Sequence, residues 1–155
     1  MLRSCGIAHD TSRAEAPRVV LDTNVIASAL RSRRGASHRL LSEIGTGRFV
    51  HAVSVALAFE YESAVLRPDA GVRLARSLID DVLDYLCSTA ERQRIYFLWR
   101  PVLPDPSDDL VLEVAVHAGC TMIVTFNARD FRGAERFGIR VITPGAFLRL
   151  LQVVS

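Results

Sequence analysis

The sequence contains no lysine, because all 19 basic residues among its 155 residues are arginines. Chemistry that depends on a lysine amine is therefore excluded within this chain, including Schiff-base formation, the phosphate-loop lysine and Ser-Lys nucleophile pairs. Cysteine is also scarce, with three residues and no CxxC pair, and the four histidines include no HxxxH pair. A zinc site or a disulfide framework is thus not expected, and the expected location is a reducing cytoplasm.

Long hydrophobic runs and a strong net charge are absent too. The best apolar stretches, Ala52–Phe59 and Leu110–Val116, fall short of the roughly 18 to 20 residues needed to cross a bilayer, so no membrane span is expected. A net charge of +2 permits a nucleic-acid partner but does not imply one. Half of the residues are hydrophobic, with 9 Gly and 6 Pro, which predicts one globular domain.

The pattern along the chain predicts a short tail followed by this domain. Residues 1–17 show no periodicity, and we expect a flexible N-terminal tail, with the folded domain at 18–155. Strands are predicted at residues 19–21, 49–54, 95–99, 122–126 and 139–142, and helices at 25–31, 37–44, 55–66, 70–90, 107–118 and 147–153. Continuous apolar strands separated by helices predict a three-layer α/β/α sandwich around a central, mostly parallel sheet of about five strands.

Acidic residues recur close to the ends of these strands. Asp22 follows the first strand, Asp130 follows the fourth, and Asp105, Asp108 and Asp109 cluster before a predicted helix. Any one of them could serve only as a helix cap or a turn residue, although three acids in one cluster exceed what a cap requires. Because the carboxyl ends of parallel strands meet at one edge of a sheet, we expect Asp22, Asp109 and Asp130 to share one crevice.

Glu60 lies in the predicted helix 55–66, from which it can reach the same crevice, and its neighbour Glu62 is expected to be solvated. By spacing alone the two glutamates could exchange roles. Carboxylates that lie close together repel one another unless cations neutralise them. Oxygen ligands without His or Cys nearby select Mg²⁺ or Mn²⁺, and two such ions about 4 Å apart suit in-line phosphodiester hydrolysis.

Five segments resemble the PIN-domain family in their residues and in their order over residues 18 to 150. They are Val20-Leu-Asp-Thr-Asn-Val25, Glu60-Tyr-Glu-Ser-Ala-Val-Leu-Arg-Pro68, Asp105-Pro-Ser-Asp-Asp109, Ile123-Val-Thr-Phe-Asn-Ala-Arg-Asp-Phe131 and Val141-Ile-Thr-Pro-Gly-Ala-Phe-Leu148. The likeness is greatest to the VapC-like ribonucleases, the toxin components of bacterial toxin–antitoxin systems. The resemblance implies the PIN fold and a Mg²⁺- or Mn²⁺-dependent endoribonuclease.

The resemblance also assigns residues to the site. It implies four acidic metal ligands, which are Asp22, Glu60, Asp109 and Asp130, and nearby polar residues that orient ligands or water, which are Thr23, Asn24 and Thr125. Asn127 stands where some relatives carry an acid, so one or two metal ions could bind. Which of Asp105, Asp108 and Asp109 is the metal ligand is left open, although Asp109 best matches the family's Asp-x-x-Leu-x-x-Ala spacing.

The partners implied by the resemblance are an RNA substrate, a separate antitoxin protein and a second copy of the chain in a homodimer. Arg31, Arg33 and Arg34 could hold RNA phosphates, or they could form a solvated charged loop. A rival function is a PIN-like module that has lost nuclease action and binds only RNA or a partner protein. A haloacid-dehalogenase-type phosphatase is a weaker rival, because Asn24 stands where that chemistry needs a second Asp.

Overall fold

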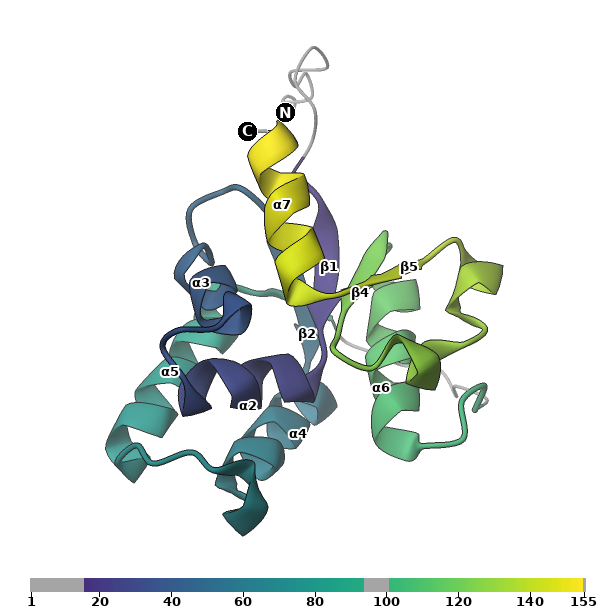
Figure 1. Ribbon diagram of the computed structural model, residues 1–155. Helices are drawn as coiled ribbons and strands as arrows, with labels where there is room; N and C mark the ends of the chain where they lie inside the picture. The colour runs from purple at the N-terminus through teal and green to yellow at the C-terminus, as the bar shows by residue number, and fades with distance from the viewer. Residues whose placement is uncertain (1–15, 94–100, 155) are drawn as a thin grey trace, which may run out of the picture.

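Among the residues that the structure describes, five parallel strands form a central sheet in the order β3-β2-β1-β4-β5 (Figure 1). The computed structural model describes residues 16–93 and 101–154. The strands are β1 (Arg18–Leu21), β2 (Val50–Ser54), β3 (Glu91–Gln93), β4 (Met122–Val124) and β5 (Arg140–Ile142). The central strand β1 is apolar and buried from Val19 to Leu21, as expected for a parallel strand covered on both faces.

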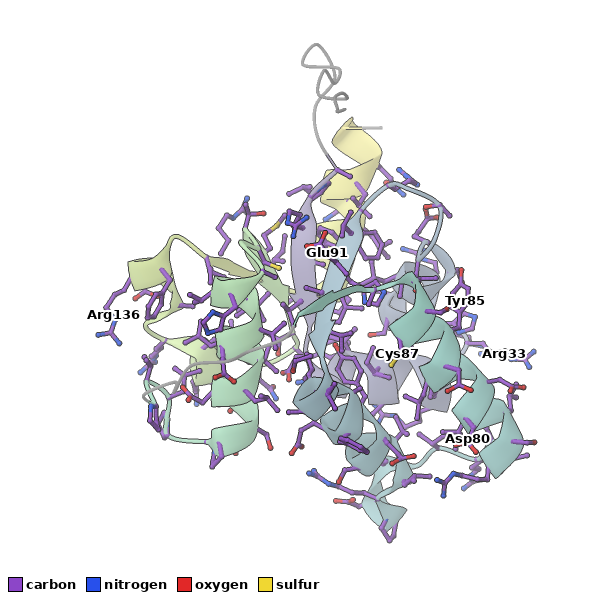
Figure 2. All side chains as sticks on the ribbon, turned by 180° about the vertical axis from the view of Figure 1, so that it is seen from behind. Arg33, Asp80, Tyr85, Cys87, Glu91 and Arg136 are labelled. Atoms are coloured by element: carbon purple, nitrogen blue, oxygen red, sulfur yellow. The ribbon has the colours of Figure 1, made fainter. Side chains whose placement is uncertain are left out.

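Helices cover both faces of this sheet. They are α2 (Thr23–Arg31), α3 (Ala36–Ser42), α4 (Val55–Leu66), α5 (Arg76–Thr89), α6 (Pro106–His117) and α7 (Pro144–Val154), with short 3-10 turns η1 (Pro68–Ala70), η2 (Ala128–Phe131) and η3 (Ala134–Phe137). Figure 1 shows α2, α3 and α7 in front of the sheet, and Figure 2 shows α4, α5 and α6 on the opposite side. The predicted three-layer α/β/α sandwich is therefore confirmed. None of the helices in the described ranges is both long and apolar enough to cross a bilayer.

Some predicted boundaries differ from the structure. The helix predicted at residues 70–90 begins only at Arg76. The chain before it forms η1 and then passes through Gly71, whose φ of 72° lies in the left-handed region that glycine adopts readily. The closing helix begins at Pro144, earlier than predicted, because proline suits the first turn of a helix.

Two predictions fall on residues that the structure does not describe. The third strand was predicted at residues 95–99, which lie outside the described residues; the described third strand is β3, at Glu91–Gln93. Most of the tail predicted at residues 1–17 also lies outside them.

The chain changes direction across the sheet between β1 and β4. Strands β1, β2 and β3 follow one another toward one edge, and β4 then returns to the other side of β1. Leu21 pairs with Val124, and the amide of Asp22 donates to the Val124 carbonyl at 2.9 Å. In open parallel sheets such a switch point leaves a crevice at the carboxyl ends of the strands. The candidate site should therefore lie where β1 and β4 end.

His51 is a buried histidine in β2 that lies away from this switch point. Its side chain is 2% exposed, its Nε2 lies 3.2 Å from Thr89 Oγ1, and its Nδ1 has no hydrogen-bond partner among the described residues. Burial lowers the pKa of His51 from 6.5 to about 4. The folded protein therefore holds His51 neutral at pH values at which the unfolded chain takes up a proton.

This difference predicts a specific acid sensitivity. Above about pH 6.5 the contribution of His51 to the free energy of unfolding is constant. As the pH falls toward 4 this contribution destabilises the folded state, because only the unfolded chain is then protonated at this histidine. When the pH is lowered from 7 to 4, the free energy of unfolding should fall by about 3 kcal/mol less in His51→Gln than in the wild type. Urea denaturation at several pH values measures this. Parallel pH profiles for the two proteins would contradict the prediction.

Candidate active site

Asp22 lies at the carboxyl end of β1, where it caps the N-terminus of α2. Its side chain is only 4% exposed, its Oδ1 accepts from the Thr23 amide at 2.8 Å, and its Oδ2 accepts from Thr125 Oγ1 at 2.7 Å. Burial raises the pKa of Asp22 above 3.8 despite these hydrogen bonds, and the charges of Asp130 and Asp105 raise it further. Capping thus leaves Asp22 with a negative charge that its surroundings do not compensate.

Thr125, at the carboxyl end of β4, joins the polar groups around Asp22. The residue is fully buried, and besides donating to Asp22 its Oγ1 accepts from the Asn127 amide at 3.0 Å and from Asn24 Nδ2 at 3.4 Å. Asn24 Oδ1 is buried without a hydrogen-bond partner in the described part of the chain. Thr125 therefore positions the Asp22 carboxylate, and Asn24 supports Thr125 from α2.

The Thr125 hydroxyl should contribute measurably to the free energy of unfolding. Thr125→Val keeps the side-chain shape but leaves Asp22 Oδ2 and the Asn127 amide without this partner. We expect the free energy of unfolding to fall by about 1–3 kcal/mol, as for other buried groups that lose a hydrogen-bond partner. Thr125→Ser keeps the hydroxyl and is the matched control. Chemical denaturation compares the two, and equal stabilities would contradict this role of the hydroxyl.

The three acids before α6 have different surroundings. Asp105 caps the helix, with Oδ1 accepting from the Ser107 amide at 2.8 Å. Asp109 is 5% exposed, and its Oδ1 accepts from the amides of Val102 and Leu103, each at 2.9 Å. Asp109 thus fastens the incoming loop to the helix. By contrast, the half-buried Asp108 carboxylate accepts no hydrogen bond from any residue that the structure describes.

The charges of Asp108 and Asp22 act on each other. The pKa of Asp108 is raised from 3.8 to about 7, first by burial and then by the charges of Asp22, Asp105 and Asp130. Asp105 and Asp130 also act on Asp22, whereas Asp109 is not among the charges that raise the pKa of either residue. Four aspartates from three separate segments therefore lie close enough to one another for their charges to interact. Asp109, which sequence spacing favoured as a ligand, instead accepts hydrogen bonds from the amides of the incoming loop.

Glu60 reaches the same region from α4. The neighbouring Tyr61 is buried, and its hydroxyl donates to the Leu21 carbonyl at 2.6 Å, which fixes α4 beside the end of β1. Glu60 Oε2 accepts from Ser107 Oγ at 3.3 Å, at the start of α6. Glu60 therefore lies beside the acids of α6.

Glu60 and Glu62, which could exchange roles by sequence spacing alone, have different surroundings in the structure. Glu62 forms an ion pair with Arg76 at 3.3 Å, with both side chains largely solvent-accessible. Asp130 is exposed on η2, where its amide donates to the Asn127 carbonyl at 3.0 Å. The Asn127 side chain is exposed as well. Asp130 thus lies at the rim of the crevice, and Glu62 belongs to the surface of α4.

The arginines suggested for RNA binding lie apart from the acids. Arg31, Arg33 and Arg34 are exposed at the end of α2, and Arg31 Nη1 donates to the Ala70 carbonyl at 3.1 Å. Asp22 caps the other end of this nine-residue helix, about 13 Å away at 1.5 Å per residue. Figure 2 shows Arg33 at the outer edge of the molecule, pointing into solvent. Only an RNA that extends well beyond the crevice could contact these arginines.

The donor set fits a hard divalent cation. Within residues 16–93 and 101–154, no group of three or more His, Cys, Asp or Glu side chains already lies at metal-holding distances. The acidic side chains gathered there nevertheless offer carboxylate oxygens, which Mg²⁺ and Mn²⁺ prefer and zinc does not. A cation would also offset the mutual repulsion that raises the pKa values of Asp22 and Asp108.

Comparison with known families agrees with this arrangement. A family model described as PIN domain matches residues 18–129, which is more than half of the 155-residue chain. The matched range includes Asp22, Glu60, Asp108 and Thr125 and ends one residue before Asp130. No curated protein matches the sequence.

Proposed function

The chain belongs to the PIN domain family, and from that premise we propose that it is an endoribonuclease that hydrolyses RNA phosphodiester bonds with Mg²⁺ or Mn²⁺. PIN domains are in general nucleases that use divalent metal ions. The observation that carries the proposal is the group of interacting acids Asp22, Asp105, Asp108 and Asp130 near the carboxyl ends of β1 and β4. None of these four forms an ion pair with an arginine or histidine of the described segments. Their charge is therefore available to a cation.

Each residue has a distinct part in the proposed mechanism. Asp22 and Asp108 would hold the cation, with Glu60 and Asp130 completing the set from α4 and η2. When bound, the divalent ion supplies an activated water and stabilises charge on the phosphate oxygens. Thr125 holds Asp22 in one orientation through its 2.7 Å hydrogen bond. Asp109 acts indirectly, because it fixes the loop that leads into α6.

Metal-dependent cleavage is the direct test of this function. Purified protein should cleave at least some single-stranded or structured RNAs with Mg²⁺ or Mn²⁺. Cleavage should stop with excess EDTA and return when excess Mn²⁺ is added. Cleavage that persists in EDTA, or no cleavage of any RNA with either metal, would contradict the proposal.

The VapC-like motifs support a further proposal, that this nuclease is the toxin of a type II toxin–antitoxin pair. It would act in the cytoplasm as a homodimer, and a separate antitoxin protein would inhibit it. Expression without an antitoxin should slow bacterial growth, and the Asp22→Asn variant should not. An active nuclease whose expression leaves growth unchanged would contradict the toxin role, and a monomer by sedimentation would contradict the dimer.

Asn127 favours one alternative function. Because an exposed amide stands there in place of an acid, the crevice has one carboxylate fewer with which to hold a second cation. A chain that had lost its metal would bind RNA or a partner protein without cleaving anything. Calorimetric titration with Mn²⁺ separates the two functions: no heat of binding, together with retained RNA affinity, would favour the binding module.

A further inference from the structure

The peptide bond that joins Leu21 to Asp22, at the carboxyl end of β1, is held from both sides. On one side the Asp22 amide donates to the Val124 carbonyl of β4 at 2.9 Å. On the other side the Leu21 carbonyl accepts from the Tyr61 hydroxyl at 2.6 Å. The N–H and C=O groups of a trans peptide point in opposite directions, so these two partners oppose each other. The backbone that carries Asp22 is therefore fixed between β4 and α4.

The pairing of the strands explains why a helix supplies the second partner. The register of β1 with β2 reaches as far as Val19, opposite His51, whereas the register of β1 with β4 continues to Leu21. Strand β2 ends at Ser54, which caps α4. On this side of β1 the Leu21 carbonyl therefore accepts from a side chain of α4, and that side chain is Tyr61.

Tyr61 also links two segments that carry proposed metal ligands. Its side chain is 1% exposed, so the ring is packed in the core while the hydroxyl reaches β1. The residue before it on α4 is Glu60, whose Oε2 accepts from Ser107 Oγ at 3.3 Å. Thr125 fixes the side chain of Asp22, and Tyr61 fixes its backbone. One hydroxyl thus ties the backbone of Asp22 to the helix turn that carries Glu60.

We propose that Tyr61 is a positioning residue of the site, whose hydroxyl sets the place of the Asp22 carboxylate relative to Glu60 and thereby the affinity for a divalent cation. The inference rests on the proposed function and adds a residue to it. Groups that orient metal ligands without touching the metal typically change metal affinity or activity about 10- to 100-fold when they are removed. A hydroxyl that served only the fold would lower stability and leave the metal affinity of the folded protein unchanged.

The test compares two tyrosine hydroxyls that each donate to a backbone carbonyl. Tyr61→Phe removes the hydroxyl of interest and keeps the buried ring. Tyr85→Phe is the matched control, because the Tyr85 hydroxyl on α5 donates to the Ile44 carbonyl at 3.0 Å and contacts none of the acids of the site. Calorimetric titration with Mn²⁺ gives the affinity. Hydrogen exchange of the Asp22 amide, followed by NMR, reports on the backbone without any metal, and thermal unfolding confirms that each variant is folded.

We expect Tyr61→Phe to weaken Mn²⁺ binding about tenfold. Exchange of the Asp22 amide should become about tenfold faster relative to that of the Arg140 amide, which donates to the Thr121 carbonyl at the amino end of β5. RNA cleavage should fall about tenfold at limiting Mn²⁺ and recover at saturating Mn²⁺. Tyr85→Phe should keep the metal affinity, the exchange ratio and the cleavage rate within about twofold of the wild type.

The positioning role would be refuted if Tyr61→Phe bound Mn²⁺ as tightly as Tyr85→Phe, or if exchange of the Asp22 amide were unchanged. A wild-type protein that bound no Mn²⁺ would refute it as well. These outcomes are separable from the failure of the nuclease proposal. If the wild type bound Mn²⁺ but cleaved no RNA, and Tyr61→Phe alone weakened the binding, the nuclease function would fall and the positioning role would stand.

Discussion

Asp22→Asn should lower RNA cleavage on the order of a hundredfold or more while leaving the protein folded. An asparagine oxygen can still accept from the Thr23 amide, so the cap on α2 survives, whereas its amide nitrogen faces Thr125 Oγ1 as a donor. The change removes a negative charge that burial disfavours in the folded state, but it also replaces the Oδ2 that accepts from Thr125 with an amide nitrogen. These two effects oppose each other, so at pH 8 without metal the free energy of unfolding should stay within about 2 kcal/mol of that of the wild type.

Cleavage rates with Mn²⁺ and urea denaturation check the two halves of this prediction. Asp69→Asn is the matched control, because Asp69 is an exposed acid on η1. It should cleave RNA at the wild-type rate. Full activity in Asp22→Asn would rule out a role for this carboxylate in the reaction, and a large loss of stability would show that its negative charge supports the fold.

The adjacent acids of α6 should give opposite results when each is replaced by alanine. Asp108→Ala should reduce cleavage about a hundredfold with little loss of stability, because the Asp108 carboxylate accepts no hydrogen bond from the described residues and its charge is disfavoured. Asp109→Ala should lower the free energy of unfolding by about 2–4 kcal/mol, because it leaves the amides of Val102 and Leu103 without their acceptor.

Each variant is the control for the other, since they differ by one position on the same helix. The decisive comparison is Mn²⁺-dependent cleavage at a temperature at which urea denaturation shows both proteins to be folded. If Asp109→Ala lost cleavage while folded and Asp108→Ala kept it, the assignment of Asp108 to the crevice would be wrong and the spacing argument for Asp109 would be correct.

The example of Asp108 and Asp109 shows where sequence reasoning reached its limit. The spacing that favoured Asp109 places it three and six residues before Leu112 and Ala115, which are both fully buried. On a helix Asp108, which lies four and seven residues before the same two side chains, is at least as close to their face as Asp109, so helical periodicity does not choose between the two aspartates. The two hydrogen bonds of Asp109 to the preceding loop require the folded structure.

Other parts of the site could be predicted because the signals were local. Asp22 directly follows the buried run Val19–Leu21, and a parallel sheet places the end of that strand at the switch point. The central position of Thr125 could not be predicted from local sequence. It depends on the pairing of Leu21 with Val124, which brings together side chains about a hundred residues apart in the chain.

A crystal structure of the protein soaked in Mn²⁺, with anomalous scattering to locate the ion, would show most directly which oxygens bind it. We expect an ion held between the Asp22 and Asp108 carboxylates, with Thr125 Oγ1 still donating to Asp22. An ion bound instead by Asp109, or a crevice that stays free of manganese at saturating concentration while Asp22 and Asp108 are ordered, would contradict this account.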